Sequence, residues 1–298
     1  MYYRAARVCG AFSAAVAVAT LTFGTPSGVA APAPEDRKPA RPSVVQTTFK
    51  SVDAVLAAQW DFPTQSPAPL VVLIPSGGRI DRNGWHPGLG EDASHGIYAQ
   101  LTSELVAKGF AVFRYDKPGA GRSSPGRFAT ERSNAIEAYT RAIDHARVDP
   151  ERVFLLGHSI GTDTIAGIFP RFEAVAAPVG TVLLDSMVGE TASLRIKAPT
   201  LIVNSGRDPD DRYQYGEFVV ESRERAEGKE METELVVIDR DKRGLLSESS
   251  KNGATVLTLD PRATGAIVDW LMRHRAGDDL AAATLAPPAA ARRAARPE

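Results

Sequence analysis

Short, continuous apolar runs recur along the chain, and segments with helical spacing lie between them. Runs such as 70–74 and 153–156 are typical of strands that are buried on both faces of a parallel sheet. Two earlier segments, 44–49 and 55–62, predict an edge strand and its hairpin partner. The predicted strands are 44–49, 55–62, 70–74, 110–115, 153–156, 181–184, 200–204 and 235–238.

Helices are predicted between most of these strands. The segment 98–108 carries apolar residues at helical spacing and ends before Gly109, a typical C-cap residue. Asp260 and Pro261 form an N-cap and N1 pair that opens the last helix, which runs to about His274. The predicted helices are 98–108, 131–146, 162–169, 214–226 and 261–274.

Strands that alternate with helices predict an α/β fold, with a mainly parallel twisted sheet of about eight strands and helices on both faces. The sequence has no repeats and no second core, so we predict one domain over residues 43–276. Only about fifteen residues separate strand 181–184 from strand 200–204. A large cap cannot be inserted at that place.

Both ends of the chain are predicted to lie outside the fold. A basic start, a short apolar stretch and small residues predict a secretory signal peptide over 1–31, followed by a Pro/Ala-rich linker over 32–42. An uncleaved signal anchor is the alternative. Residues 277–298 are rich in Ala, Pro and Arg and are predicted to be a disordered tail. We therefore expect a secreted protein, either extracellular or in the cell envelope.

The composition excludes several classes of function. Of the 298 residues, 43% are hydrophobic and 24% are charged, which is typical of a globular protein. The net charge of −1 provides no attraction to nucleic acid or acidic membranes. Cys9 is the only cysteine and lies in the predicted signal peptide, so the mature protein would have neither a disulfide nor a thiol nucleophile. The sequence carries no metal-site motif and no phosphate loop, and we predict no metal and no cofactor.

Residues 157–161, Gly-His-Ser-Ile-Gly, fit the pattern G-x-S-x-G and lie between a predicted strand and a predicted helix. In this context the motif predicts a nucleophile elbow, a sharp turn that holds the Ser159 hydroxyl clear of the sheet. The flanking glycines are needed because side chains there would collide with the adjacent strand and helix. The helix N-terminus offers N–H groups to a developing oxyanion. His158 is predicted to pack in the scaffold, pointing away from Ser159.

A serine nucleophile needs a base, and the base needs an acid that orients it. Around an elbow of this kind the chain order is serine, acid, histidine. We favour Asp208 as the acid because it lies in the loop after strand 200–204, and loops at the carboxyl ends of such strands build the site. A plain Asp-Pro turn is the alternative for Asp208, and Asp185 is the reserve acid.

The base is missing from its expected place. Of five histidines only one follows the predicted acid, near the end of the last predicted helix. The loop after the last predicted strand should carry the base but contains no histidine, and its Arg243 keeps its proton at any ordinary pH. His86 or His95, in the long loop before residue 98, are alternative bases that could reach Ser159.

Three motifs in this order resemble the α/β-hydrolase superfamily, in particular capless bacterial esterases related to the serine aminopeptidase and dienelactone hydrolase groups. The motifs are 76–84 (Ser-Gly-Gly-Arg-Ile-Asp-Arg-Asn-Gly), 114–123 (Arg-Tyr-Asp-Lys-Pro-Gly-Ala-Gly-Arg-Ser) and the elbow at 157–161. The resemblance covers about residues 45–275.

The resemblance also implies roles for individual residues. Ser159 would be the nucleophile and Asp208 the acid. The backbone N–H of Ile160 and one N–H from the Gly77 region would form the oxyanion hole. At the position where the family has its catalytic histidine, this sequence has Arg243. This departure bears on hydrolytic activity and not on the fold.

These residues lead to two main hypotheses. The first is a secreted serine hydrolase that cleaves small ester or related acyl substrates through a Ser159 acyl-enzyme, with Arg243 in place of the usual base. The alternative is a catalytically impaired hydrolase-fold protein that binds a ligand or partner. A non-hydrolytic enzyme on the same scaffold is a third option, because fold does not fix function. The partner expected under the first hypothesis is a small-molecule acyl substrate.

Overall fold

The computed structural model describes residues 42–84, 96–205, 215–226, 232–238, 245–251 and 254–275. The predicted signal peptide, the predicted tail and all of the predicted linker except its last residue lie outside these ranges, so they stay predictions. None of the helices in the described ranges combines the length and apolar character that a membrane crossing requires.

Eight strands of the described chain form one mostly parallel sheet, as predicted. Its order is β1-β2-β4-β3-β5-β6-β7-β8. The hairpin of β1 and β2 is antiparallel, β2 also runs antiparallel to β4, and every later pairing in the sheet is parallel. The strands are β1 (Ser43–Ser51), β2 (Ala54–Phe62), β3 (Ala68–Ile74), β4 (Ala111–Tyr115), β5 (Val148–His158), β6 (Gly180–Leu184), β7 (Thr200–Ser205) and β8 (Thr233–Ile238).

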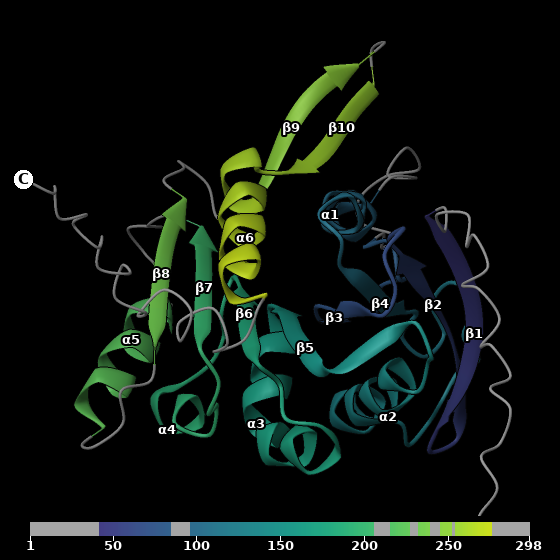
Figure 1. The fold of residues 1–298 in the computed structure, drawn as a ribbon, viewed down its shortest axis with the longest axis horizontal. Coiled ribbons are helices and arrows are strands. Elements are labelled where there is room, and N and C mark those ends of the chain that lie inside the picture. Colours follow the sequence, from purple (N-terminus) through teal and green to yellow (C-terminus); the bar gives the residue numbers. More distant parts are fainter. Residues whose placement is uncertain are drawn as a thin grey trace, which may run out of the picture. The chain divides into compact units, whose positions relative to one another are not determined.

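Helices cover both faces of this sheet, as Figure 1 shows. One face packs against α1 and α6, and the other against α2 and α3 with α4 and α5 beside them. This double cover explains the continuous apolar runs, because every residue of β3 is buried whichever face it points to. The helices are α1 (Ile97–Ala107), α2 (Glu131–Ile143), α3 (Ile160–Val175), α4 (Glu190–Ser193), α5 (Tyr215–Arg225) and α6 (Pro261–His274).

The helix ends follow the sequence signals. Gly109, just beyond α1, has a φ of 88°, a left-handed conformation that glycine adopts without strain. The Asp260 side chain accepts a hydrogen bond from the Arg262 N–H, and Pro261 occupies the first turn of α6. Both helix ends were predicted from the sequence.

The segment between β6 and β7 agrees with the prediction, whereas the segment after β8 differs from it. The segment between β6 and β7 contains only the four-residue α4, so no cap is inserted there, as predicted. The prediction that no strand follows 235–238 is wrong. A two-stranded antiparallel hairpin of β9 (Leu246–Lys251) and β10 (Ala254–Leu259) lies between β8 and α6 and forms a separate small sheet (Figure 1).

Candidate active site

Ser159 occupies a sharp turn between β5 and α3, as the elbow motif predicted. Its φ of 52° and ψ of −118° are strained for a residue with a side chain. A Cβ atom on Gly161 would lie 2.3 Å from the carbonyl oxygen of Ile74, and one on Gly157 would lie 3.0 Å from the backbone of Gly161. The two flanking glycines are therefore required by close backbone approach, which is the reason given for them from the sequence.

The contacts of Ser159 hold its backbone and leave its hydroxyl weakly bound. The Ser159 N–H donates to the carbonyl of Leu184 at 2.8 Å, which ties the elbow to the end of β6. Its hydroxyl donates to the sulfur of Met187 at 3.3 Å. Thr162 holds the backbone of Met187, because its hydroxyl oxygen accepts the Met187 N–H at 2.9 Å. A thioether is a weak acceptor, so the Ser159 hydroxyl can turn to a stronger base.

The segment predicted to supply the oxyanion hole lies against the start of α3. A Cβ atom on Gly77 would be 3.1 Å from the side chain of Ile160, so the structure brings these two predicted residues together. The peptide groups of Ser76 are held from two sides. The Ser76 N–H donates to the Tyr98 hydroxyl and the Ser76 carbonyl accepts from the Lys117 ammonium, each at 2.9 Å.

Tyr98 and Lys117 are buried, with 1% and 4% of their surfaces exposed. Lys117 also forms an ion pair with Glu131 at the start of α2, which supplies a counter-charge for the buried ammonium. Sequence reasoning did not assign either residue a part in holding Ser76. We infer that they fix the backbone just before Gly77, and with it the direction of the N–H groups there.

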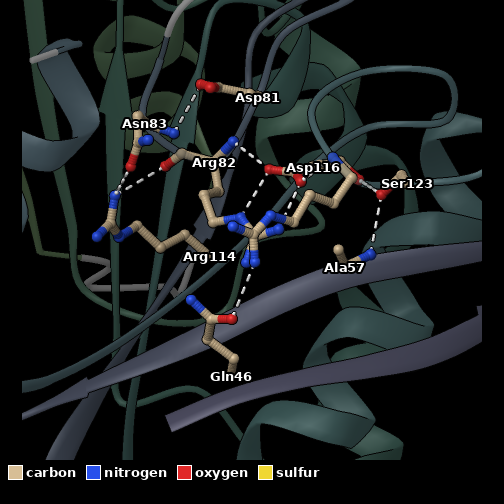
Figure 2. A network of polar contacts seen from close by, with 9 residues as sticks. Gln46, Ala57, Asp81, Arg82, Asn83, Arg114, Asp116 and Ser123 are labelled. Atoms are coloured by element: carbon tan, nitrogen blue, oxygen red, sulfur yellow. Dashed lines mark hydrogen bonds and ion pairs between the residues drawn. The ribbon is translucent and has the colours of Figure 1, made fainter. Parts of the chain in front are cut away.

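A polar network anchors the chain that follows this segment, as Figure 2 shows. Asp116 accepts hydrogen bonds from the backbone N–H and the guanidinium of Arg82, and from the N–H of Arg122 at 2.8 Å. Burial acts to raise the pKa of Asp116, but the hydrogen bonds from Arg82 and Arg122 outweigh it and hold the pKa below its ordinary value. The guanidinium of Arg114 adds bonds to the carbonyl of Arg82 and the side chain of Asn83.

His158 is bonded to the scaffold and not to Ser159, as predicted. Its Nδ1 lies 2.9 Å from the Tyr98 oxygen. That oxygen accepts the Ser76 N–H, and burial raises the pKa of Tyr98 to about 12, so Tyr98 keeps its proton and donates it to Nδ1. The neutral imidazole then carries its hydrogen on Nε2. Burial lowers the pKa of His158, and the charge of Asp185 acts in the opposite direction.

Asp185, the reserve acid, bonds to the end of the neighbouring strand. It follows β6 with a φ of 41°. Its Oδ1 accepts hydrogen bonds from the Ser205 N–H at 2.9 Å and the Ser205 hydroxyl at 2.8 Å. One carboxylate oxygen of Asp185 thus joins the carboxyl ends of β6 and β7.

The remaining predicted site residues fall in other parts of the chain. Asp208, Arg243, His86 and His95 lie outside the described residues, so their roles stay predictions. His274 is described and lies away from the elbow, stacked on the Trp270 ring and bonded to the Trp270 carbonyl and to Glu232. The described residues contain no cluster of three or more His, Cys, Asp or Glu side chains suited to a metal ion.

Residues 86–203 match the family model described as serine aminopeptidase, S33. A comparison with curated proteins finds no match.

Solved structures share the fold at low sequence identity. The α/β hydrolase GrgF from Penicillium sp. sh18 has a TM-score of 0.54 and 12% identity, and the match covers 78% of this chain and 99% of that one. Est1E from Butyrivibrio proteoclasticus, solved with ferulic acid, has a TM-score of 0.53 and 15% identity over 76% and 98% of the two chains. The dienelactone hydrolase-like promiscuous phosphotriesterase P91, from metagenomic libraries, has a TM-score of 0.53 and 14% identity over 78% and 98%.

Proposed function

We propose that this chain, whose α/β-hydrolase fold confirms the resemblance seen in its sequence, is a serine hydrolase that cleaves small ester or related acyl substrates. The observation that carries the proposal is the strained elbow at Ser159, with Gly77 packed against Ile160 beside it. A serine held in this way presents its hydroxyl next to two backbone segments that can stabilise negative charge.

The proposed reaction passes through an acyl-enzyme. The Ser159 oxygen forms a bond to the acyl carbon, and the bond from that carbon to the leaving oxygen breaks. The serine proton passes to a base and then to the leaving alcohol, and water later releases the acid by the reverse path. Negative charge on the carbonyl oxygen would be met by the N–H of Ile160 and one from the Gly77 segment, whose backbone Tyr98 and Lys117 hold.

The identity of the base is part of the proposal. Among the three described histidines none bonds to Ser159, since His145 accepts the Arg147 N–H, His158 bonds to Tyr98 and His274 lies at the end of α6. We propose that Asp208 is the acid, that Arg243 stands at the usual place of the base, and that His86 or His95 supplies the imidazole. We further propose that the protein is secreted after removal of residues 1–31, which the mass of the mature protein from culture medium tests.

The test is hydrolysis of p-nitrophenyl acetate by the full mature domain, together with mass-shift labelling by a fluorophosphonate. We expect turnover and an adduct on Ser159, both lost in Ser159→Ala. The matched control is Ser103→Ala on the exposed side of α1, which should keep both. If activity is found, His86→Gln and His95→Gln identify the base, and Arg243→His should raise the rate.

The second function is a catalytically impaired protein that binds a ligand or partner. The observation that favours it is that no described histidine bonds to the Ser159 hydroxyl, which instead contacts a thioether. Folded protein that shows neither turnover nor an adduct would overturn the hydrolase and leave this second function.

A further inference from the structure

A small cavity lies beside the elbow, between α1, the carboxyl ends of β5 and β6, and the base of the β9–β10 hairpin. Its volume is about 90 Å³. Most of its wall is aliphatic, with Leu101 from α1, Leu184 from β6 and Leu259 from β10 among the lining residues. Tyr98, His158 and Asp185 supply the polar part of the wall, and the Tyr98 hydroxyl is already bonded to Ser76 and His158.

His158 and Asp185 each keep one polar atom without a protein partner in the described chain. Nδ1 of His158 accepts from Tyr98, so Nε2 carries a hydrogen that no described group accepts. Oδ1 of Asp185 is bonded twice to Ser205, whereas Oδ2 has no described donor. The residues that carry this donor and this acceptor both line the mostly apolar cavity, and a hydroxyl group, which both donates and accepts, is the kind of group that can pair with both.

The volume limits what can enter. A cavity of about 150 Å³ lined by aliphatic and aromatic side chains takes benzene, with its six carbon atoms. On that scale 90 Å³ holds about three or four non-hydrogen atoms. A chain of three carbons that bears one hydroxyl is of this size.

The cavity adjoins the nucleophile through the backbone. His158 precedes Ser159 directly, and the Leu184 carbonyl accepts the Ser159 N–H at 2.8 Å. Of the two parts of an ester, only the acyl part stays bonded to the serine in the acyl-enzyme. The residue before Ser159 and the residue that accepts its N–H therefore both belong to the wall of this cavity.

We propose that this cavity is the acyl subsite and that it selects short hydroxyacyl groups, of which 3-hydroxybutanoyl is the type. Beyond its carbonyl carbon this group has three carbons and one hydroxyl. The hydroxyl accepts from Nε2 of His158 and donates to Oδ2 of Asp185, and the carbons contact the leucines. The proposal rests on the proposed hydrolase function, since it names the substrate class of that site.

The first experiment measures binding without catalysis, so that it does not depend on turnover. Methyl 3-hydroxybutanoate and methyl butanoate are titrated into the Ser159→Ala protein and followed by NMR. We expect the hydroxy ester to bind at least about tenfold more tightly, the effect of one satisfied donor–acceptor pair. Equal affinities would overturn the proposal, whatever the p-nitrophenyl acetate assay shows.

A second experiment removes one of the two polar atoms. Asn in place of Asp185 tolerates a positive φ and keeps an oxygen for Ser205, but it replaces the free acceptor by a donor. In the Ser159→Ala background, Asp185→Asn should reduce the hydroxyl preference to less than about threefold. The matched control, Asp269→Asn on the exposed face of α6, should retain it. A preference that survives Asp185→Asn in folded protein would show that the hydroxyl is not recognised here.

Discussion

Three buried tyrosines differ in what their hydroxyl groups bond to, and this difference gives a graded prediction for the free energy of unfolding. Tyr98, Tyr115 and Tyr139 are each at most 1% exposed. Tyr98 accepts the Ser76 N–H and donates to His158, Tyr139 donates to the Ala176 carbonyl at 2.6 Å, and the Tyr115 hydroxyl has no partner in the described chain.

Replacement by phenylalanine removes each hydroxyl with little change in ring packing. Tyr98→Phe leaves a partly buried N–H and a partly buried imidazole nitrogen unpaired, at about 1–3 kcal/mol for each, partly offset because the hydroxyl is no longer buried. We expect a loss of about 2–4 kcal/mol. Tyr139→Phe leaves one carbonyl unpaired and should lose about 1–2 kcal/mol. Tyr115→Phe leaves nothing unpaired and should be neutral, or stabilising by up to about 1 kcal/mol.

The assay is urea unfolding of the three variants and the wild type, followed by tryptophan fluorescence. The slope of the free energy against urea should not change, because the exposed area on unfolding is almost the same. The ranking Tyr98, Tyr139, Tyr115 is the prediction, and the wild type is the reference for each. If Tyr98→Phe lies within about 0.5 kcal/mol of Tyr115→Phe, the two hydrogen bonds of Tyr98 do not hold the Ser76 backbone as argued.

Two further predictions concern the elbow and two partly buried histidines. Gly161→Ala should destabilise the protein by about 3 kcal/mol or more, because its Cβ would lie 2.3 Å from the Ile74 carbonyl oxygen. In Gly265→Ala, within α6, the added Cβ meets nothing within 4 Å, so this variant should be stabilised by about 0.5–1 kcal/mol. Thermal melts of both variants test this, and shifts of the same sign in the two melting temperatures would contradict it. Burial lowers the pKa values of His145 and His158, so the unfolded chain binds more protons below its own histidine pKa of about 6.5, and stability should fall as the pH decreases from 7.5 to 5.5. Urea midpoints at the two pH values measure this, and equal midpoints would count against imidazoles that stay neutral in the folded protein.

The central strands of the main sheet could be predicted because burial on both faces requires continuous runs of apolar residues, which are visible in the sequence. The β9–β10 hairpin could not be found in the same way. Residues 247–251, Ser-Glu-Ser-Ser-Lys, show no apolar alternation, since this hairpin forms a sheet of its own. The Asn252-Gly253 dipeptide between the two strands was the available signal, as this pair is typical of two-residue hairpin loops.

The site was predicted in part, for a related reason. The elbow is local, so five consecutive residues define it. The groups that hold Ser76 come from 22 and 41 residues further along the chain, and only the fold brings them together. The sequence shows that Tyr98 and Lys117 exist but not that they meet the same peptide. Asp208 and Arg243 follow strands that are confirmed, while their own roles stay predictions.

The backbone angles of residue 159 bear on the choice between an enzyme and a binding protein. A φ of 52° with a ψ of −118° costs a residue with a Cβ atom about 1–3 kcal/mol, and glycine avoids most of that cost. A domain of ordinary stability has only about 5–15 kcal/mol in total. A lineage with no use for the hydroxyl would therefore gain a sizeable margin by a single change to glycine. The backbone conformation by itself disfavours serine here, so its presence at position 159 favours the proposed nucleophile over a purely structural role for this residue.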